Sequence, residues 1–276
     1  MIAYPHINPE IVRIGPVAIR WYGLMYAAGF ASSYALVKYQ LKKIRQGSAA
    51  AGKGKGRNAA TKEIPGEFLD ALYTYLIVGL ILGARLGYVL FYDLSSYIRN
   101  PLEILAVWHG GMSFHGGMIG SLLAGYLCCR KYRVDFWQVA DLVVVTAPIG
   151  LGLGRLGNFI NGELFGRTTN VPWAMVFPQG GPLPRHPSQL YEFALEGILL
   201  FTILWLLKNR KHAPGTMVAA CLMLYGLFRI IAEFFRQPDA QLGFIMGPFT
   251  MGQILSALTI LGGIVLYVFR KRAVVS

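Results

Sequence analysis

Seven apolar stretches dominate this sequence, and each is close to the roughly 20 residues that a helix needs to cross the hydrocarbon core of a bilayer. Only 14% of the residues are charged, whereas about a quarter of the residues of a soluble domain normally carry a charge. Too few charges therefore remain to cover a water-facing surface. We predict an all-α integral membrane protein whose residues 1–276 form a single polytopic membrane domain.

The charge pattern predicts how the spans are oriented. Seventeen of the 26 Lys and Arg residues fall in four places, 38–62, 130–133, 208–211 and 270–272, which alternate with loops poor in positive charge. Cytoplasmic loops of membrane proteins hold such an excess, so we predict the N-terminus outside and the C-terminus inside. The seven predicted spans lie near Val17–Val37, Phe68–Tyr92, Gly111–Cys129, Val139–Phe159, Leu190–Leu207, Gly215–Phe235 and Pro248–Phe269.

The same pattern explains the formal net charge of +13. Basic loops orient the chain and attract anionic membrane lipids, so we expect lipids as partners and no nucleic acid. The three cysteines have neither a disulfide framework nor a zinc spacing, and we expect no metal site. The N-terminus lacks a basic segment followed by a small-residue cleavage site, so we expect no removable signal peptide.

Two connections between spans have distinctive compositions. Residues 47–61 are rich in glycine, alanine and lysine, which predicts a flexible cytoplasmic connection. Residues 166–187 contain many prolines and glycines, which predicts a turn-rich cap loop on the outer, periplasmic side. Within the second span, Gly79, Gly83 and Gly87 recur every four residues, a spacing that predicts close packing between helices.

Ionisable side chains at membrane depth are costly and therefore mark candidate functional sites. The spans or their ends contain Arg85, Arg155, Glu163, Glu192, Glu196, Arg229 and Glu233. Helical spacing places Arg229, Glu233 and Arg236 on one face of the sixth span. Arg155 and Asn158 likewise share a face of the fourth span. Arginines at the outer half of the bilayer suit a phosphate, which the planar guanidinium grips with two hydrogen bonds.

The same arginines have a second interpretation, in which Arg–Glu pairs only tie helices together. For Arg85 both interpretations stay open, and we include it among the candidate substrate-binding residues. His115 raises a similar choice, since it stands beside the Gly116–Gly117 pair at the outer start of the third span. Histidine takes up a proton near neutral pH, but a single interfacial histidine is often structural.

Five motifs, in order along the chain, resemble those of the prolipoprotein diacylglyceryl transferases. They are Arg-Trp-Tyr-Gly-Leu-Met-Tyr at 20–26, Gly-Gly-Met-Ser-Phe-His-Gly-Gly at 110–117, the segment 154–167, His-Pro-Ser-Gln-Leu-Tyr-Glu at 186–192, and Tyr225–Gly226 followed by Arg229, Glu233, Arg236, Pro238 and Asp239. The resemblance covers nearly the whole chain except the connection 47–61, which looks longer than usual.

The resemblance implies transfer of a diacylglyceryl group from phosphatidylglycerol to a thiol, without cofactor or metal, in the bacterial inner membrane. The thiol belongs to the lipobox cysteine of a prolipoprotein signal peptide; a thioether forms and glycerol phosphate leaves. By motif position, Arg155 and Arg229 would hold the phosphate, with Arg236 on the same stripe, and Glu233 would orient them. His115 would be a candidate base. The positions that the family needs for activity are those of Tyr26, Asn158, Glu163 and Gly166.

Two other functional classes compete with an enzyme. A transporter or channel would use the arginines to line a path for an anion or lipid, and its sequence is expected to show an internal repeat with paired broken helices. We find no motif repeated between the halves. A non-catalytic lipid-binding subunit would leave the histidine beside tight glycines without a reason. Turnover in detergent separates the enzyme from both classes.

Overall fold

The structure, a computed structural model, describes residues 2–5, 7–15, 17–50, 64–106, 110–238, 244–246 and 249–275. It divides into two compact units, Met1–Val37 with Ala140–Ser276, and Lys38–Val139. Each unit is described by itself below, as unit 1 and unit 2. Helices make up most of both, which confirms the helical membrane class. Unit 1 also contains two short antiparallel two-stranded sheets, which hydropathy did not predict.

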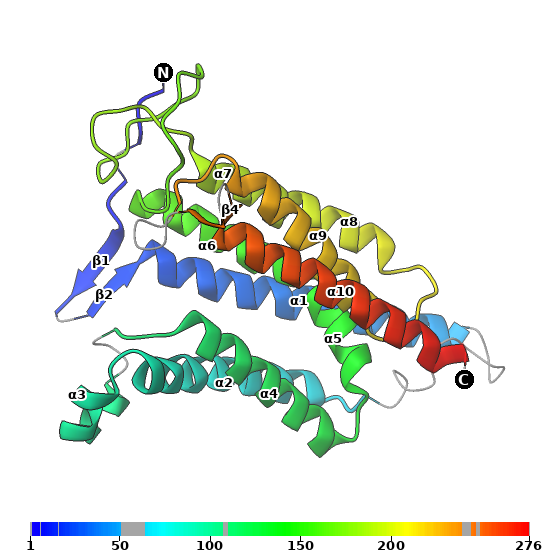
Figure 1. Ribbon diagram of the computed structural model, residues 1–276. Coiled ribbons are helices and arrows are strands. Elements are labelled where there is room, and N and C mark those ends of the chain that lie inside the picture. The colour runs from blue at the N-terminus through cyan, green and yellow to red at the C-terminus, as the bar shows by residue number, and fades with distance from the viewer. Residues whose placement is uncertain are drawn as a thin grey trace. The chain divides into compact units, whose positions relative to one another are not determined.

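Unit 1 starts with a β-hairpin that leads directly into a long helix (Figure 1). Its elements are β1 (Glu10–Ile14), β2 (Val17–Arg20), α1 (Trp21–Ala50, in unit 1 to Val37), α5 (Phe136–Val144, in unit 1 from Ala140), α6 (Ala147–Asn161), α7 (Ser188–Glu192), η4 (Phe193–Leu199), α8 (Leu200–Leu207), α9 (Thr216–Glu233), β3 (Phe244–Met246), β4 (Phe249–Thr250) and α10 (Met251–Val275). The helix of the first span therefore begins four residues later than predicted, at Trp21, since 17–20 pair with β1.

The predicted fourth span is not one straight helix. α5 and α6 are bent by 43° at a short break. At this break the Thr146 hydroxyl donates to the Val143 carbonyl at 2.7 Å, and such side-chain bonds compete with the helical ladder. Pro148 follows in the first turn of α6, where a missing N–H costs nothing. The bend separates the first part of the predicted span from the part that bears Arg155.

The predicted fifth span contains a wide helical turn. Residues 188–207 form one continuous apolar helix, but its middle part, η4, is π-helical. π-helical turns occur frequently at functional sites. A Cβ on Gly152 of α6 would lie 2.9 Å from Gly197 Cα of η4, so these two elements approach to backbone contact. This approach brings Glu192 and Glu196 next to α6.

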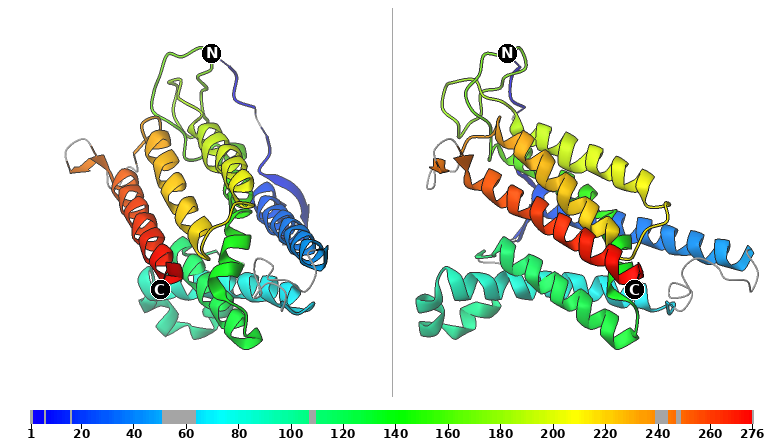
Figure 2. Two further views of the ribbon diagram at one scale, coloured as in Figure 1. Left: turned by 90° about the vertical axis from the view of Figure 1, so that its right-hand side faces the viewer. Right: turned by 45° about the vertical axis from the view of Figure 1, so that its right-hand side comes forward.

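Helices α9 and α10 lie side by side in unit 1 (Figures 1 and 2). A Cβ on Gly226 would lie 2.6 Å from Ile260 Cγ1 and 2.7 Å from the Ser256 carbonyl oxygen. Only glycine therefore fits where the two helices meet. This contact fixes the C-terminal half of α9, which bears Arg229 and Glu233, against α10.

Unit 2 is built on a second helix pair, with elements α2 (Phe68–Phe91), α3 (Leu94–Arg99), η2 (Pro101–Leu105) and α4 (Phe114–Tyr132). A Cβ on Gly83 would lie 2.7 Å from Gly120 Cα, and a Cβ on Gly87 would lie 2.8 Å from Gly116 Cα. The predicted close packing at these glycines is confirmed, and α4 runs antiparallel to α2 (Figure 1).

The chain is a multi-pass membrane protein. Four helices in the described residues are long and apolar enough to cross a membrane, and the bent pair of α5 and α6 raises the number to five. The four are Phe68–Phe91, Ser188–Leu207, Thr216–Glu233 and Met251–Arg272. Helices α1 and α4 do not qualify by apolar composition, because Trp, Tyr, Gly and Ser residues lower the mean hydropathy of α1 before Lys38, and α4 is rich in glycine and ends in Arg130–Lys131.

The two distinctive connections are described to different extents. α1 continues to Ala50, so 47–50 are helical, and the rest of the predicted connection 47–61 lies outside the described residues. Between α6 and α7 the chain forms an irregular excursion braced by paired backbone bonds between Met175 and Arg185. Tyr4, Phe159, Met175 and Phe177 form a small hydrophobic core beneath it. The Tyr4 hydroxyl donates to the Phe159 carbonyl at 2.6 Å, which ties the N-terminal segment to the end of α6.

Candidate active site

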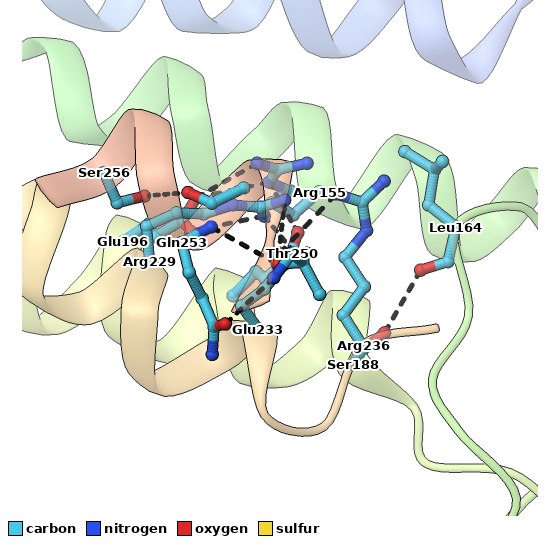
Figure 3. A network of polar contacts seen from close by, with 12 residues as sticks. Arg155, Leu164, Ser188, Glu196, Arg229, Glu233, Arg236, Thr250, Gln253 and Ser256 are labelled. Atoms are coloured by element: carbon cyan, nitrogen blue, oxygen red, sulfur yellow. Dashed lines mark hydrogen bonds and ion pairs between the residues drawn. The ribbon is translucent and has the colours of Figure 1, made fainter. Parts of the chain in front are cut away.

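Six charged side chains from different parts of unit 1 meet in one cluster, most of which is drawn in Figure 3. We call it the charged cluster; it consists of Arg155, Glu192, Glu196, Arg229, Glu233 and Arg236. The predicted stripe on the sixth span is confirmed, because Arg229 Nη2 lies 3.0 Å from Glu233 Oε2 one turn along α9. Arg236 Nη1 lies 3.8 Å from the same oxygen.

Two arginines share the carboxylates of the fifth span. Arg155 Nε lies 2.8 Å from Glu192 Oε2, and Arg155 Nη2 lies 3.2 Å from Glu196 Oε2. Arg229 Nη1 lies 2.9 Å from the other oxygen of Glu192 and 3.7 Å from Glu196 Oε1. Both carboxylates are fully buried. Glu192 and Glu196 thus bridge α6 to α9 and hold the two guanidinium groups side by side.

The cluster has equal numbers of positive and negative groups, and Arg155 is its most exposed arginine. Three arginines face three glutamates, so the ionised cluster has no net charge. The Arg155 side chain is 19% exposed, compared with 10% for Arg229. Arg155 Nη1 has no hydrogen-bond partner among the described residues. An anion that enters the cluster would therefore meet Arg155 first.

A second polar group lies one helical turn from Arg155. The buried Asn158 amide donates to Glu163 Oε1 at 2.8 Å, and Asn161 donates to the same oxygen at 3.2 Å. Gly162 ends α6 in the left-handed conformation with φ of 68°, which turns Glu163 back toward the helix. Gln189 of α7 donates to the Glu163 carbonyl at 2.6 Å. The end of α6 is thereby joined to the helix that bears Glu192.

Gly166 lies in a narrow space between two other segments. Its N–H donates to the His186 carbonyl, and the Arg167 N–H donates to the Phe235 carbonyl, both at 2.9 Å. A Cβ on Gly166 would lie 2.6 Å from both His186 Cβ and the Phe235 carbonyl oxygen. The guanidinium of Arg167 also donates to the Arg236 carbonyl at 2.9 Å. This three-stranded contact fixes the backbone from which Arg236 reaches the charged cluster.

The remaining predicted site residues lie elsewhere in the two units. Tyr26 of α1 is 45% exposed, and its ring packs 5.2 Å from that of Tyr22, which lies against Gly157 of α6. Arg85 and His115 belong to unit 2. His115 is exposed in the first turn of α4, where the hydroxyl of the N-cap residue Ser113 accepts from the Gly116 N–H at 3.2 Å.

Arg85 is buried and its guanidinium is surrounded by backbone carbonyls. It donates to the carbonyls of Glu103, Ile104, Ala106, Gly110 and Gly111, and it lies over the Tyr97 ring with a 5.0 Å separation. These bonds use all three of its nitrogens. In this structure Arg85 holds the two ends of the segment that leads from η2 to α4.

Sequence reasoning missed two groups of site residues. Thr250, at the start of α10, contacts the charged cluster through Glu233; it is the first residue of the spacing Thr-x-x-Gln before an apolar run, which is a recognisable helix-start signal. Ser188 and Gln189 bond the carbonyls of Leu164 and Glu163, and no local signal predicts such long-range bonds. In the described part of the chain, no group of His, Cys, Asp and Glu could hold a metal ion.

A chain of hydrogen bonds next to Gly166 makes the irregular excursion sensitive to acid. Trp173 Nε1 donates to the Tyr191 hydroxyl at 2.7 Å, and that hydroxyl lies 3.1 Å from His186 Nδ1. Burial lowers the pKa of His186 below its ordinary value of 6.5. Neutral His186 with an unprotonated Nδ1 can accept from Tyr191, whereas the protonated ring can only donate.

We expect acid to destabilise this region through His186. The unfolded chain binds the proton on His186 more readily than the folded chain does. The contribution of neutral His186 to the free energy of unfolding is therefore complete above pH 6.5 and is lost as pH drops through the lower pKa of the folded state. Deuterium uptake in peptides covering 166–187, relative to the intrinsic exchange rate at each pH, should rise as pH falls from about 7.5 to about 5. His186→Gln should reduce that rise. An unchanged rise in the variant would contradict the assignment.

Comparison with known proteins places this geometry in a family. The family model for prolipoprotein diacylglyceryl transferase matches residues 9–269. The chain belongs to the prolipoprotein diacylglyceryl transferase family. The resemblance seen in the sequence motifs is thereby confirmed.

Individual relatives agree over nearly the full length. A phosphatidylglycerol–prolipoprotein diacylglyceryl transferase of Desulfotalea psychrophila is 53% identical over 272 residues, which cover 96% of this chain and 94% of the relative. The protein of the same name from Geobacter sulfurreducens is 49% identical over 269 residues, 98% of this chain and 97% of the relative. That from Bordetella avium is 48% identical over 273 residues, 99% and 98% respectively. The charged cluster thus belongs to a diacylglyceryl transferase scaffold.

Proposed function

We propose that this chain transfers the diacylglyceryl group of phosphatidylglycerol to the lipobox cysteine of prolipoproteins, the first step of bacterial lipoprotein maturation. The charged cluster carries the proposal, because it sets the buried Arg229 and the partly buried Arg155 guanidinium groups side by side where a lipid phosphate can bind. The names of the relatives supply both substrates. The lipobox, the thioether product and the inner-membrane location follow from the family resemblance.

The proposed reaction forms one bond and breaks one. The cysteine sulfur attacks the glyceryl carbon, a carbon–sulfur bond forms, and the carbon–oxygen bond to the phosphate breaks with its electrons leaving on glycerol phosphate. Arg155 and Arg229 stabilise the negative charge that grows on the leaving phosphate, and Arg236 adds a third cation. Glu233 orients Arg229. Tyr26, Asn158 and Glu163 are proposed as further residues needed for catalysis, and Gly166 as part of the substrate-binding site; no cofactor is needed, since the lipid carries its own leaving group.

His115 is the proposed base for the thiol proton. A free thiol has a pKa near 8.5 and reacts only as thiolate, so a proton acceptor accelerates the step. The assignment rests on the family motif that contains His115 and on its exposure at the start of α4. His115→Gln should lower turnover by about 10²-fold or more and flatten the pH profile. Near-normal turnover across pH would remove His115 as the base.

Arg85 is proposed as a substrate-binding residue, and its contacts give it a competing role. Five backbone carbonyls already occupy the guanidinium, so lipid binding requires some of these bonds to open. We expect Arg85→Lys to raise KM for phosphatidylglycerol if it binds lipid, and to lower kcat and the melting temperature if it holds the loop. The exposed Arg99→Lys serves as control.

We further propose seven spans with the N-terminus outside and the C-terminus inside. The alternation of basic and weakly charged loops supports this topology, with α1 and α4 as the additional spans. The excursion 166–187 would then be a periplasmic cap loop, and 47–61 a cytoplasmic connection. Cysteine labelling from each side of sealed vesicles tests the orientation, with single cysteines at the exposed positions Gln46 and Gln179 expected to react from opposite sides.

The decisive experiment for the function uses the purified protein in detergent. Phosphatidylglycerol and a lipobox peptide are supplied, and the peptide is analysed by mass spectrometry. A peptide heavier by one diacylglyceryl group, and unchanged when its cysteine is replaced by serine, supports the transferase. No adduct from a folded sample would leave lipid binding or transport as the better account.

A further inference from the structure

Thr250 is a buried residue at the junction of β4 and α10 that bonds the charged cluster. Its side chain is 2% exposed, and its hydroxyl donates to Glu233 Oε1 at 3.0 Å. The other oxygen of Glu233 forms the ion pair with Arg229. Figure 3 shows Thr250 and Gln253 beside the arginines of the cluster. Thr250 is therefore linked through Glu233 to Arg229, a proposed phosphate ligand, by one hydrogen bond and one ion pair.

The direction of the Thr250 hydroxyl is set by a reciprocal pair of bonds with Gln253. The Gln253 N–H donates to Thr250 Oγ1 at 3.3 Å, and Gln253 Oε1 accepts the Thr250 N–H at 3.1 Å. This is a capping box, which satisfies the free N–H groups of the first turn of a helix. Because Oγ1 already accepts from Gln253, its proton is left for Glu233.

Gly252 leaves the space in which the Glu233 carboxylate fits. A Cβ at Gly252 would lie 2.7 Å from the carboxyl carbon of Glu233. The carboxylate thus rests on the first turn of α10, where the helix dipole favours a negative charge. Thr250 and Gly252 together fix both the distance and the rotation of Glu233 relative to α10.

We propose that Thr250 is a positioning residue of the transferase: its hydroxyl sets the rotation of the Glu233 carboxylate and thereby aims the Arg229 guanidinium at the lipid phosphate. This inference rests on the proposed function. Thr250 itself touches no substrate in this account. Its effect passes through one hydrogen bond and one ion pair, 3.0 Å each.

Three variants separate positioning from helix capping. Thr250→Val keeps the shape but removes the hydroxyl, Thr250→Ser keeps the hydroxyl, and Gln253→Met removes one bond of the capping box while leaving Thr250 and Glu233 in place. We expect kcat/KM for phosphatidylglycerol to fall about tenfold or more in Thr250→Val and to stay within about twofold in the other two. Gln253→Met should lower only the melting temperature. Equal losses of activity in Thr250→Val and Gln253→Met would overturn the proposal.

A double-mutant cycle tests whether Thr250 acts through Glu233. In a Glu233→Gln background, Thr250→Val should cost less than about twofold in kcat/KM, because the carboxylate that it orients is gone. Independent, multiplying losses would overturn the proposal. If Thr250→Val does not fold, Thr250→Asp replaces it; Asp caps helices well but repels Glu233, so the variant should be folded and weakly active.

Lipid affinity distinguishes failure of this proposal from failure of the proposed function. Binding of phosphatidylglycerol in mixed micelles, followed by tryptophan fluorescence, needs no turnover. If the unmodified protein binds lipid but transfers nothing, the transferase proposal fails, and a tenfold weaker Kd for Thr250→Val still supports positioning of Arg229. If transfer is normal and Thr250→Val changes neither Kd nor kcat/KM, only the role of Thr250 fails.

Discussion

Replacing Arg229 by alanine should reduce transfer by at least two to three orders of magnitude, the loss typical for removal of one group that stabilises a developing oxyanion. Arg229 is buried, and the two carboxylates closest to it are those of Glu192, at 2.9 Å, and Glu233, at 3.0 Å. Its removal leaves the phosphate with one fewer fixed cation. Mass spectrometry of the lipobox peptide measures the rate.

The same change also threatens the fold, so the experiment needs a second variant. Breaking a buried ion pair costs about 3–5 kcal/mol, and Arg229→Ala leaves Glu233 with Arg236 at 3.8 Å as its ion-pair partner among the described residues. Arg229→Lys keeps the charge but cannot span both carboxylates, so we expect a folded protein with a loss of about tenfold or more. The exposed Arg210→Ala should retain full activity. Near-normal transfer by folded Arg229→Ala would exclude Arg229 from phosphate binding.

Gly166→Ala should abolish activity for a different reason, the lack of space. The added Cβ would stand 2.6 Å from His186 Cβ and from the Phe235 carbonyl oxygen, and overpacking of this kind typically costs about 1–3 kcal/mol. Relief requires that Phe235 or His186 move. Either shift disturbs the backbone bonds that hold Arg236 and Arg167.

A matched glycine controls for the effect of the methyl group alone. A Cβ added to Gly262 of α10 would meet no atom of another described residue within 4 Å, so Gly262→Ala should leave transfer and melting temperature unchanged. Gly166→Ala should lower both. If Gly166→Ala kept full transfer, the three-stranded contact around Gly166 would be dispensable for the site.

Much of the fold follows from local sequence pattern, and the exceptions have physical causes. Hydropathy located most of the long helices to within a few residues, since a helix in lipid must be apolar over its whole length, but α1 continues to Ala50, well past the predicted end at Val37. It missed the bend at Thr146, where a side chain bonds the backbone, and the pairing of 17–20 with 10–14, because hydropathy reports neither side-chain bonds nor strand pairing. The π-helical turn of η4 likewise leaves no trace in hydropathy.

The site was predictable only where its residues share a helix. The spacing of Arg229, Glu233 and Arg236 is enough to place them on one stripe, and their ion pairs confirm it. That Arg155 would share Glu192 and Glu196 with Arg229 depends on the approach of α6 to η4. Contacts between residues about 40 positions apart cannot be read from spacing alone.

The equal numbers of arginines and glutamates in the charged cluster favour product departure over retention. Phosphatidylglycerol brings one negative charge, whereas a phosphate monoester carries about −1.5 to −2 near neutral pH. A cluster without surplus positive charge has little hold on the more highly charged species. The enzyme would thus avoid strong product inhibition by its own leaving group. Weak inhibition by added glycerol phosphate would be the kinetic evidence for this.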